Sequence, residues 1–178
     1  MGTRNVNMND VVRNPDSAGT LLTATNAEIN NAADVSTRLI SIADATNTLS
    51  LTQATHANRI CVSLDASLAV TLPEATGTGD SYTVMMGIAA TAVTIVTADT
   101  TNAGFAGFIM GSDTDAAGTY SWVATTGTSD TITLNGVATG GKIYDWVRVT
   151  DVATDRWMLE GNITQSGGSE ATPISSAA

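Results

Sequence analysis

The chain has 178 residues, of which 43% are hydrophobic, and this suits one domain with a sizeable core. Threonine (30 residues) and alanine (26) dominate, against seven basic and 17 acidic residues. The single cysteine excludes an internal disulfide framework and any multi-cysteine metal site. So few charges leave much of the surface neutral, and we expect part of it to contact other proteins.

The charges are distributed unevenly along the chain. Residues 1–59 have a net charge of −1, whereas residues 60–178 have a net charge of −9. Because an acidic body repels phosphate, we expect no direct binding of nucleic acid. The N-terminus lacks the apolar core of a secretory signal, and no apolar stretch approaches the about 20 residues needed to cross a bilayer. We therefore expect synthesis in a cytoplasm and no membrane partner.

Residues 1–37 are predicted to form an extended N-terminal docking arm. The segment is rich in Asn, Ala and Thr, and no period of 2 or 3.6 residues continues through it. A weak helix is possible around residues 26–34, although three asparagines disfavour it. We expect the arm to lie against neighbouring chains; folding back onto its own body is the alternative.

From residue 38 onward, short runs of strand-forming residues alternate with turn residues. The expected strands are residues 39–42, 48–51, 60–64, 68–72, 82–88, 92–96, 120–124, 131–134, 144–150 and 156–160. No long amphipathic helix separates them to make parallel crossovers. The prediction is therefore an all-β body over residues 38–165, an antiparallel sandwich or barrel of the jelly-roll kind. Residues 166–178, which begin near a Gly-Gly-Ser sequence, are expected to be a short flexible C-terminal tail.

The apolar pattern also predicts which faces are buried. In residues 60–64 and 68–72 the large apolar side chains alternate with smaller ones, so the large ones are expected to face inward. Residues 84–86 are apolar on both faces, and the second cover could be a partner subunit, a sandwich interior or a loop. Residues 104–111 form a glycine-punctuated apolar segment, either a buried loop or an interface patch. The candidate interface residues are Val11, Val12, Leu21, Leu22, Val84, Met85, Met86, Phe105 and Phe108.

Residues that could carry chemistry are scarce. The single histidine, His56, lacks the further ligands that a zinc site needs, and we expect its imidazole to bond to local backbone at a strand entrance. Cys61 is expected to be a small strand residue rather than a reactive thiol. No P-loop, dinucleotide fingerprint or Gly-x-Ser-x-Gly elbow is present, so we expect no cofactor and no enzymatic activity.

Two pairs of acidic residues in predicted loops are possible calcium ligands. Asp113 with Asp115, and Asp151 with Asp155, lack the fuller pattern of an EF-hand or an RTX repeat, and solvated loop acids or Asx turns are the simpler interpretation. A glycosidase pair is conceivable, but the sequence brings no two acids to a defined distance. A sugar platform is also conceivable, although core or interface anchors are the commoner role for the three tryptophans, Trp122, Trp146 and Trp157.

The body resembles a group of tailed-phage virion proteins. The resemblance covers residues 38–174 and is carried by the strings LSLT (49–52) with HANRI (56–60), VTLPEATGTG (70–79), DTITL (130–134), DWV (145–147), WMLEG (157–161) and ATP (171–173). Similar strings occur in small capsid decoration (cement) proteins and in modules of head or tail fibres.

This resemblance implies a trimeric, β-rich protein on the outside of a phage head, where it clamps the joints between major capsid proteins. The expected partners are the major capsid protein and two further copies of the chain, and the expected location is the virion exterior. The alternative is a trimeric head or tail fibre, or a receptor-binding module, that recognises host-surface glycan. A glycan-degrading enzyme ranks third.

Overall fold

Strands make up nearly all the regular structure in the computed structural model, which describes residues 38–116, 118–124 and 129–176. These residues belong to one unit, which spans Ser36–Ala178. The predicted arm, the weak helix at residues 26–34 and four candidate interface residues (Val11, Val12, Leu21 and Leu22) lie outside the described residues. The expectation of an all-β body is confirmed.

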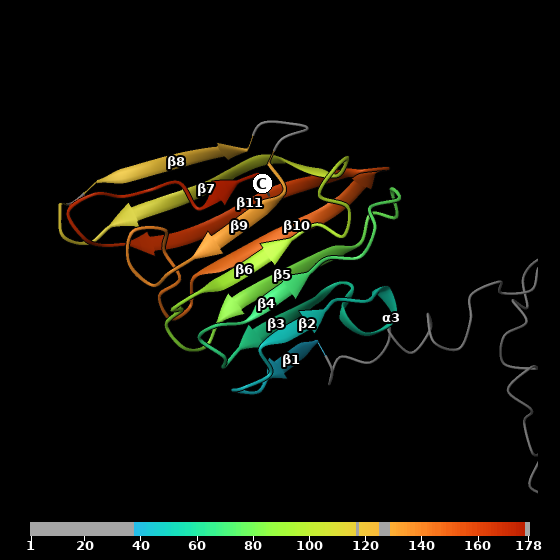
Figure 1. Ribbon diagram of the computed structural model, residues 1–178, viewed down its shortest axis with the longest axis horizontal. Helices are drawn as coiled ribbons and strands as arrows, with labels where there is room; N and C mark the ends of the chain where they lie inside the picture. The colour runs from blue at the N-terminus through green and yellow to red at the C-terminus, as the bar shows by residue number, and fades with distance from the viewer. Residues whose placement is uncertain (1–37, 117, 125–128, 177–178) are drawn as a thin grey trace, which may run out of the picture. The chain divides into compact units, whose positions relative to one another are not determined.

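The strands form two sheets that lie over one another (Figure 1). The seven-stranded sheet has the order β1 (Leu39–Ile42), β3 (Arg59–Ser63), β5 (Ser81–Met86), β10 (Trp146–Ala153), β11 (Arg156–Gln165), β7 (Gly104–Asp113) and β8 (Thr119–Ala124). The five-stranded sheet has the order β12 (Ile174–Ser175), β9 (Thr131–Leu134), β6 (Val93–Val96), β4 (Ala69–Thr71) and β2 (Thr48–Ser50). Both sheets are open in the described part of the chain, so of the two predicted alternatives, a sandwich or a barrel, the barrel is wrong.

The first six strands alternate between the two sheets as the chain advances. As a result β1, β3 and β5 are parallel neighbours in one sheet, and β2, β4 and β6 are parallel neighbours in the other. The expectation of purely antiparallel sheets, and of a jelly roll built from them, is wrong for this half of the body. A parallel pair needs a crossover, and here a strand of the opposite sheet makes it in place of a helix.

The remaining strands pair mostly in the antiparallel sense. β10 joins β5 to β11, β8 lies beside β7, and β9 joins β6 to β12. β7 and β11 are again parallel over their full lengths. The two sheets are therefore mixed, and the body is an open two-layer arrangement.

One hydrophobic core lies between the sheets. The five-stranded sheet contributes Val70, Ile95 and Ile132, all essentially inaccessible to solvent. The seven-stranded sheet contributes Trp157, which contacts Tyr82 edge to face with the ring centroids 5.8 Å apart. Aliphatic side chains thus fill most of the core, as the few aromatic residues in the sequence require.

The predicted inward face is correct for β4 and wrong for β3. Cys61 and Ser63 face the core with exposed fractions of 2% and 0%, whereas Ile60 and Leu64 are 37% and 42% exposed. The pairing of Cys61 with Val84 of β5 places Cys61 on the core side. The buried Ser63 hydroxyl donates to a backbone carbonyl 2.8 Å away, so its inward position leaves no unsatisfied hydroxyl.

Two further expectations are corrected. Residues 104–111 are not a buried loop but most of strand β7, because the full-length pairing with β11 satisfies their backbone groups; two of them, Phe108 and Met110, face outward. The predicted flexible tail is ordered at Ile174, which is 7% exposed and pairs with Ile132 as the edge strand β12.

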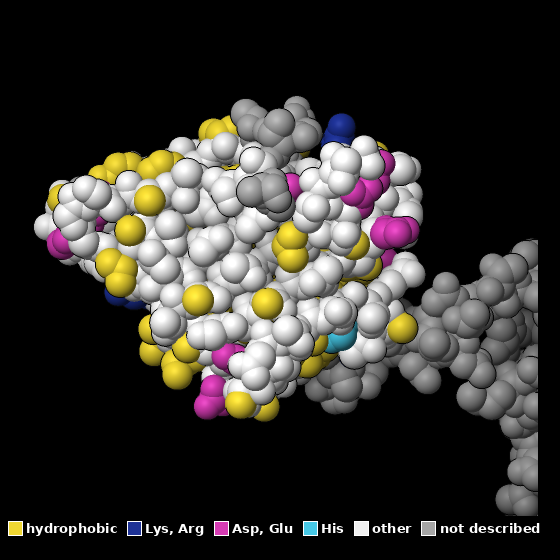
Figure 2. Space-filling view, viewed as in Figure 1, with side chains coloured by type: hydrophobic (Ala, Val, Ile, Leu, Met, Phe, Trp, Pro, Cys, Tyr) yellow, Lys and Arg dark blue, Asp and Glu magenta, His cyan; other side chains and the backbone are white. Residues whose placement is uncertain are grey.

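Threonine and serine line the outer face of the five-stranded sheet. Their pairing aligns Thr48, Thr94 and Thr133 with Ala69 in one row across the sheet. This face therefore shows mostly neutral side chains, with acidic ones toward its margin (Figure 2). Many of the chain's threonines therefore lie on the solvent-facing side of strands whose other side is buried in the core.

A single turn of helix, α3 (Gln53–His56), connects β2 to β3. No helix in the described residues is long and apolar enough to span a membrane.

Candidate functional site: the outer face of the seven-stranded sheet

The outer face of the seven-stranded sheet is unusually apolar for a surface that no described segment of the chain covers. Strand register aligns two rows of outward side chains across all seven strands. The first row is Leu39, Ile60, Thr83, Arg148, Glu160, Phe108 and Val123, and the second is Ser41, Val62, Met85, Trp146, Asn162, Met110 and Ser121.

The apolar members of this face are strongly exposed at its two ends. Leu39 is 58% exposed on β1, while Phe108 and Val123 are 50% and 68% exposed on β7 and β8. Met110 and Met158 are about half exposed on the same face. Single exposed apolar residues are ordinary, but rows of them on a flat sheet are typical of an interaction surface.

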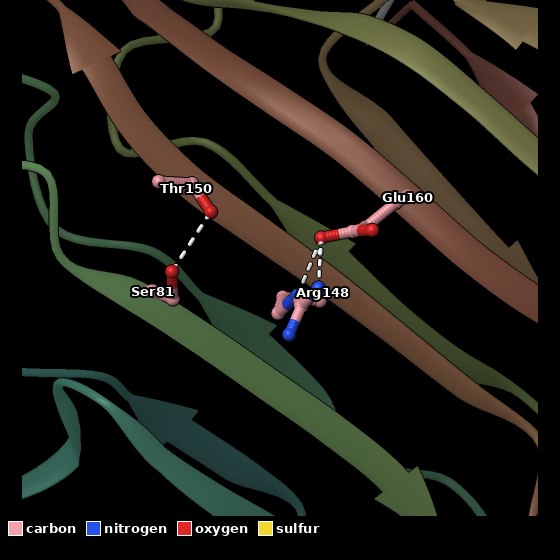
Figure 3. A network of polar contacts seen from close by, with 4 residues as sticks. All are labelled: Ser81, Arg148, Thr150 and Glu160. Carbon is pink, nitrogen blue, oxygen red and sulfur yellow. Dashed lines mark hydrogen bonds and ion pairs between the residues drawn. The ribbon is translucent and has the colours of Figure 1, made fainter.

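The middle of the face is polar, and its charged side chains pair with each other within the chain (Figure 3). Arg148 of β10 forms an ion pair with Glu160 of β11, and its guanidinium carbon lies 6.0 Å from the ring centroid of Trp146. The hydroxyls of Ser81 and Thr150 are hydrogen-bonded at 2.8 Å. The charges at the centre of this surface are therefore already paired within the chain.

Beside this centre lies an open groove of about 480 Å³. It combines an indole face, two guanidinium groups and several hydrogen-bonding side chains, and no carboxylate lines it. The lining residues are Asn58, Arg59, Ile60, Ser81, Thr83, Met85, Trp146 and Arg148. Such a groove can stack a flat ring or a sugar on Trp146 and hydrogen-bond its polar groups.

The structure divides the predicted interface residues between the core and this face. Val84, Met86 and Phe105 are at most 3% exposed, so their side chains lie in the core of the chain. Met85 and Phe108 lie on the outer face. The prediction that residues 84–86 are apolar on both faces is thus correct, but only the outward residue of the three is available to a partner.

The three tryptophans do not form a common platform. Trp157 is fully buried in the core. Trp122 packs against the core, and its Nε1 donates to Oε1 of the buried Gln165 at 2.8 Å. Trp146 alone among them lies on the outer face and lines the groove.

His56 lies where the sequence analysis expected, and Cys61 is a strand residue as expected although it faces the core. The backbone N–H of Thr52 donates to Nδ1 of the buried His56 at 2.9 Å, which confirms the predicted bond to local backbone. Burial lowers the pKa of His56 below its usual value. Burial likewise raises the pKa of the Cys61 thiol to about 11, so at neutral pH the thiol is protonated and a poor nucleophile.

Asp151 holds a turn. Its buried carboxylate accepts hydrogen bonds from the backbone N–H groups of Thr76, Gly77 and Thr78, at 3.1, 2.6 and 3.0 Å, and from the Thr78 hydroxyl at 2.9 Å. Burial disfavours the charged form, but these hydrogen bonds outweigh it and hold the pKa of Asp151 below its usual value. Asp151 is therefore committed to the loop after β4.

Sequence reasoning considered Trp146 only as part of a sugar platform with the other two tryptophans, and it missed the groove residue Arg148 and its partner Glu160. The alternation along β10 contains the signal, because Trp146, Arg148 and Thr150 share one face while Val147 and Val149 share the other. The sequence does not show that β3 and β5, which are distant from β10 in the chain, pair beside it and complete the groove.

Comparisons of the chain with protein-family models, with curated proteins and with solved structures gave no significant match.

Proposed function

We propose that this protein is a structural component of a virus particle, a capsid decoration (cement) protein that binds the outside of a tailed-phage head as a trimer. The observation that supports an assembly role is the outer face of the seven-stranded sheet, with its exposed apolar rows around a neutralised centre. The viral setting, the trimer and the major capsid protein as partner come from the resemblance of the strand and turn strings.

The composition of this face suits a permanent contact. Apolar area contributes roughly 25 cal/mol per Å² when it leaves water, so rows that include Leu39, Phe108 and Val123 favour association. Burying a lone charge would oppose association, but Arg148 and Glu160 already satisfy each other. Sheets pack well face to face at about 10 Å, which allows another flat β surface to cover this one.

The proposal is tested by placing a charge at one end of the face. In Phe108→Glu and Val123→Glu the new carboxylate would be buried without a partner on assembly, so both variants should lose the trimer mass in light scattering. They should also lose binding to heads that lack the protein, measured by co-sedimentation. Val137→Glu is the matched control, since Val137 is 48% exposed but lies in the loop after β9.

A monomeric wild-type chain, or full head binding by both outer-face variants, would contradict the proposal. Circular dichroism separates loss of assembly from loss of folding. Counting the copies per particle adds an independent test, because hundreds of copies fit a shell component and a few dozen or fewer fit a fibre.

The groove supports a second candidate, a fibre or receptor-binding module that recognises host-surface glycan. Trp146 offers a stacking surface, while the Thr83 hydroxyl, which also lines the groove, offers a hydrogen bond to a sugar hydroxyl. In this case glycan-array binding and cell adsorption should disappear in Trp146→Ala and persist in Phe108→Glu. Retention of both activities in Trp146→Ala would rule out the groove as the glycan site.

A further inference from the structure

Three carboxylates from two segments of the chain converge at the end of β7. Asp113 is the last residue of β7, Asp115 follows it, and Glu170 lies in the loop between β11 and β12. One oxygen of each carboxylate lies within 4.8 Å of the other two. Glu170 is more than 50 residues from the Asp pair in sequence, so the tertiary structure alone assembles this set.

Two oxygens of this cluster are buried without a hydrogen-bond partner. Asp113 is 6% exposed, and its Oδ2 accepts no hydrogen bond. Oε1 of Glu170 is likewise buried and accepts none. Leaving a buried carboxylate oxygen unsatisfied is costly, so a missing positive partner is indicated.

Three of the other four oxygens accept hydrogen bonds that fix the carboxylates in place. Oδ1 of Asp113 accepts from the backbone N–H of Asp115 at 2.9 Å, and Oδ2 of Asp115 accepts from the N–H of Gly167 at 2.9 Å. Oε2 of Glu170 accepts from the hydroxyl of Tyr120 at 3.2 Å. The orphaned oxygens thus belong to side chains that the fold already holds.

A shared proton is the competing explanation. The carboxyl groups of Asp113 and Asp115 can hydrogen-bond through one proton, and this lowers the pKa of Asp113 and raises that of Asp115. A proton between these two groups leaves Glu170 without a positive partner, whereas a cation can contact all three carboxylates.

We propose that Asp113, Asp115 and Glu170 form a binding site for a calcium ion. Calcium takes six to eight oxygen ligands at about 2.3–2.6 Å and accepts irregular geometry, so three carboxylates from two segments, together with water, can complete its shell. The bound ion ties the β7–β8 turn to the loop that leads to β12. It therefore fastens the C-terminal edge strand to the seven-stranded sheet.

Terbium luminescence on the full chain tests the site, with Tb³⁺ as the probe. Tyr120 contacts Glu170 and stacks on Trp122 with the ring centroids 5.7 Å apart, so excitation of these rings should sensitise a bound Tb³⁺. We expect saturable emission at one ion per chain, displaced by Ca²⁺ in preference to Mg²⁺. We also expect a melting temperature that rises with Ca²⁺ concentration.

Single neutral substitutions assign the ligands. Asp113→Asn, Asp115→Asn and Glu170→Gln should each weaken Ca²⁺ binding by at least about tenfold, because ligand charge sets the affinity of such sites. Glu74→Gln, which removes an exposed carboxylate elsewhere, should bind like the wild type. Asp115 and Glu170 are less buried than Asp113, so their variants test the site even if Asp113→Asn fails to fold.

Three results would overturn the proposal. The first is the absence of saturable Tb³⁺ emission at one ion per chain. The second is unchanged Ca²⁺ affinity in both Asp115→Asn and Glu170→Gln. The third is a melting temperature that depends on pH but not on Ca²⁺, which would show that the carboxyls hold a shared proton.

Discussion

Replacing Asp151 by asparagine removes the charge that organises the loop at residues 76–78. An amide has one acceptor oxygen, so it can replace Oδ2, with its three hydrogen bonds, or Oδ1, with the bond to Gly77, but not both. Even in the better orientation the amide NH₂ faces the Gly77 N–H. One lost charge-assisted bond and three weakened ones amount to about 3 kcal/mol.

For a chain of this size, 3 kcal/mol corresponds to a fall in Tm of about 6–12 °C. Urea unfolding followed by tryptophan fluorescence at pH 7 measures the loss directly. Asp44→Asn is the control, because the exposed Asp44 accepts one hydrogen bond, from the neighbouring Ala45 N–H, and should change stability by less than about 0.5 kcal/mol.

The pH dependence supplies the sharper test. The folded pKa of Asp151 lies below its unfolded value of about 3.9, so the carboxylate stabilises the fold above that pH. Its contribution is lost as the pH falls through the folded pKa. The stability gap between wild type and Asp151→Asn should therefore be constant from pH 7 to about 5 and shrink below about 4. A gap under about 1 kcal/mol at pH 7, or one that does not change in acid, would refute the reasoning.

Three other predictions concern single residues. Gly107 has φ +142°, and a Cβ there would lie 2.0 Å from the carbonyl oxygen of Leu159. Gly107→Ala should therefore destabilise the fold by at least about 2 kcal/mol in urea unfolding, and a smaller loss would contradict this close approach of the two strands. The single histidine, His56, should titrate in NMR with a midpoint below 6.5, since its burial favours the neutral ring and lowers its pKa; a midpoint at or above 6.5 would be inconsistent. Cys61 should resist a thiol reagent in the native protein and react fully in denaturant, and rapid labelling of the folded chain would disprove its burial.

Local signals in the sequence predicted the strands well. The expected residues 39–42 and 131–134 are the observed bounds of β1 and β9, and the other expected strands overlap those observed. Alternating side chains and turn residues act over a few positions, so a short stretch contains all the information needed. β7 was not predicted, because its glycines are typical of a loop. Its backbone becomes a strand through pairing with β11, which the local sequence does not show.

The candidate sites were far less predictable. Of the residues predicted to make contacts, Phe108 and Met85 lie on the outer face, whereas Val84, Met86 and Phe105 lie in the core. Asp113 and Asp115 were weighed as calcium ligands without Glu170, because nothing in the sequence links a loop before β12 to the end of β7.

Composition and spacing by themselves determined an all-β body, the places of most of its strands and the neutrality of much of its surface. The tertiary structure decided the parallel pairing of β1, β3 and β5, the convergence of the acidic cluster, and which face of each strand is buried. A strand has two faces of equal period, so alternation alone cannot choose between them. In β3 the pairing register with β5 determines which face is buried. It turns Cys61 and Ser63 inward and leaves Ile60 on the outer face that we propose for assembly.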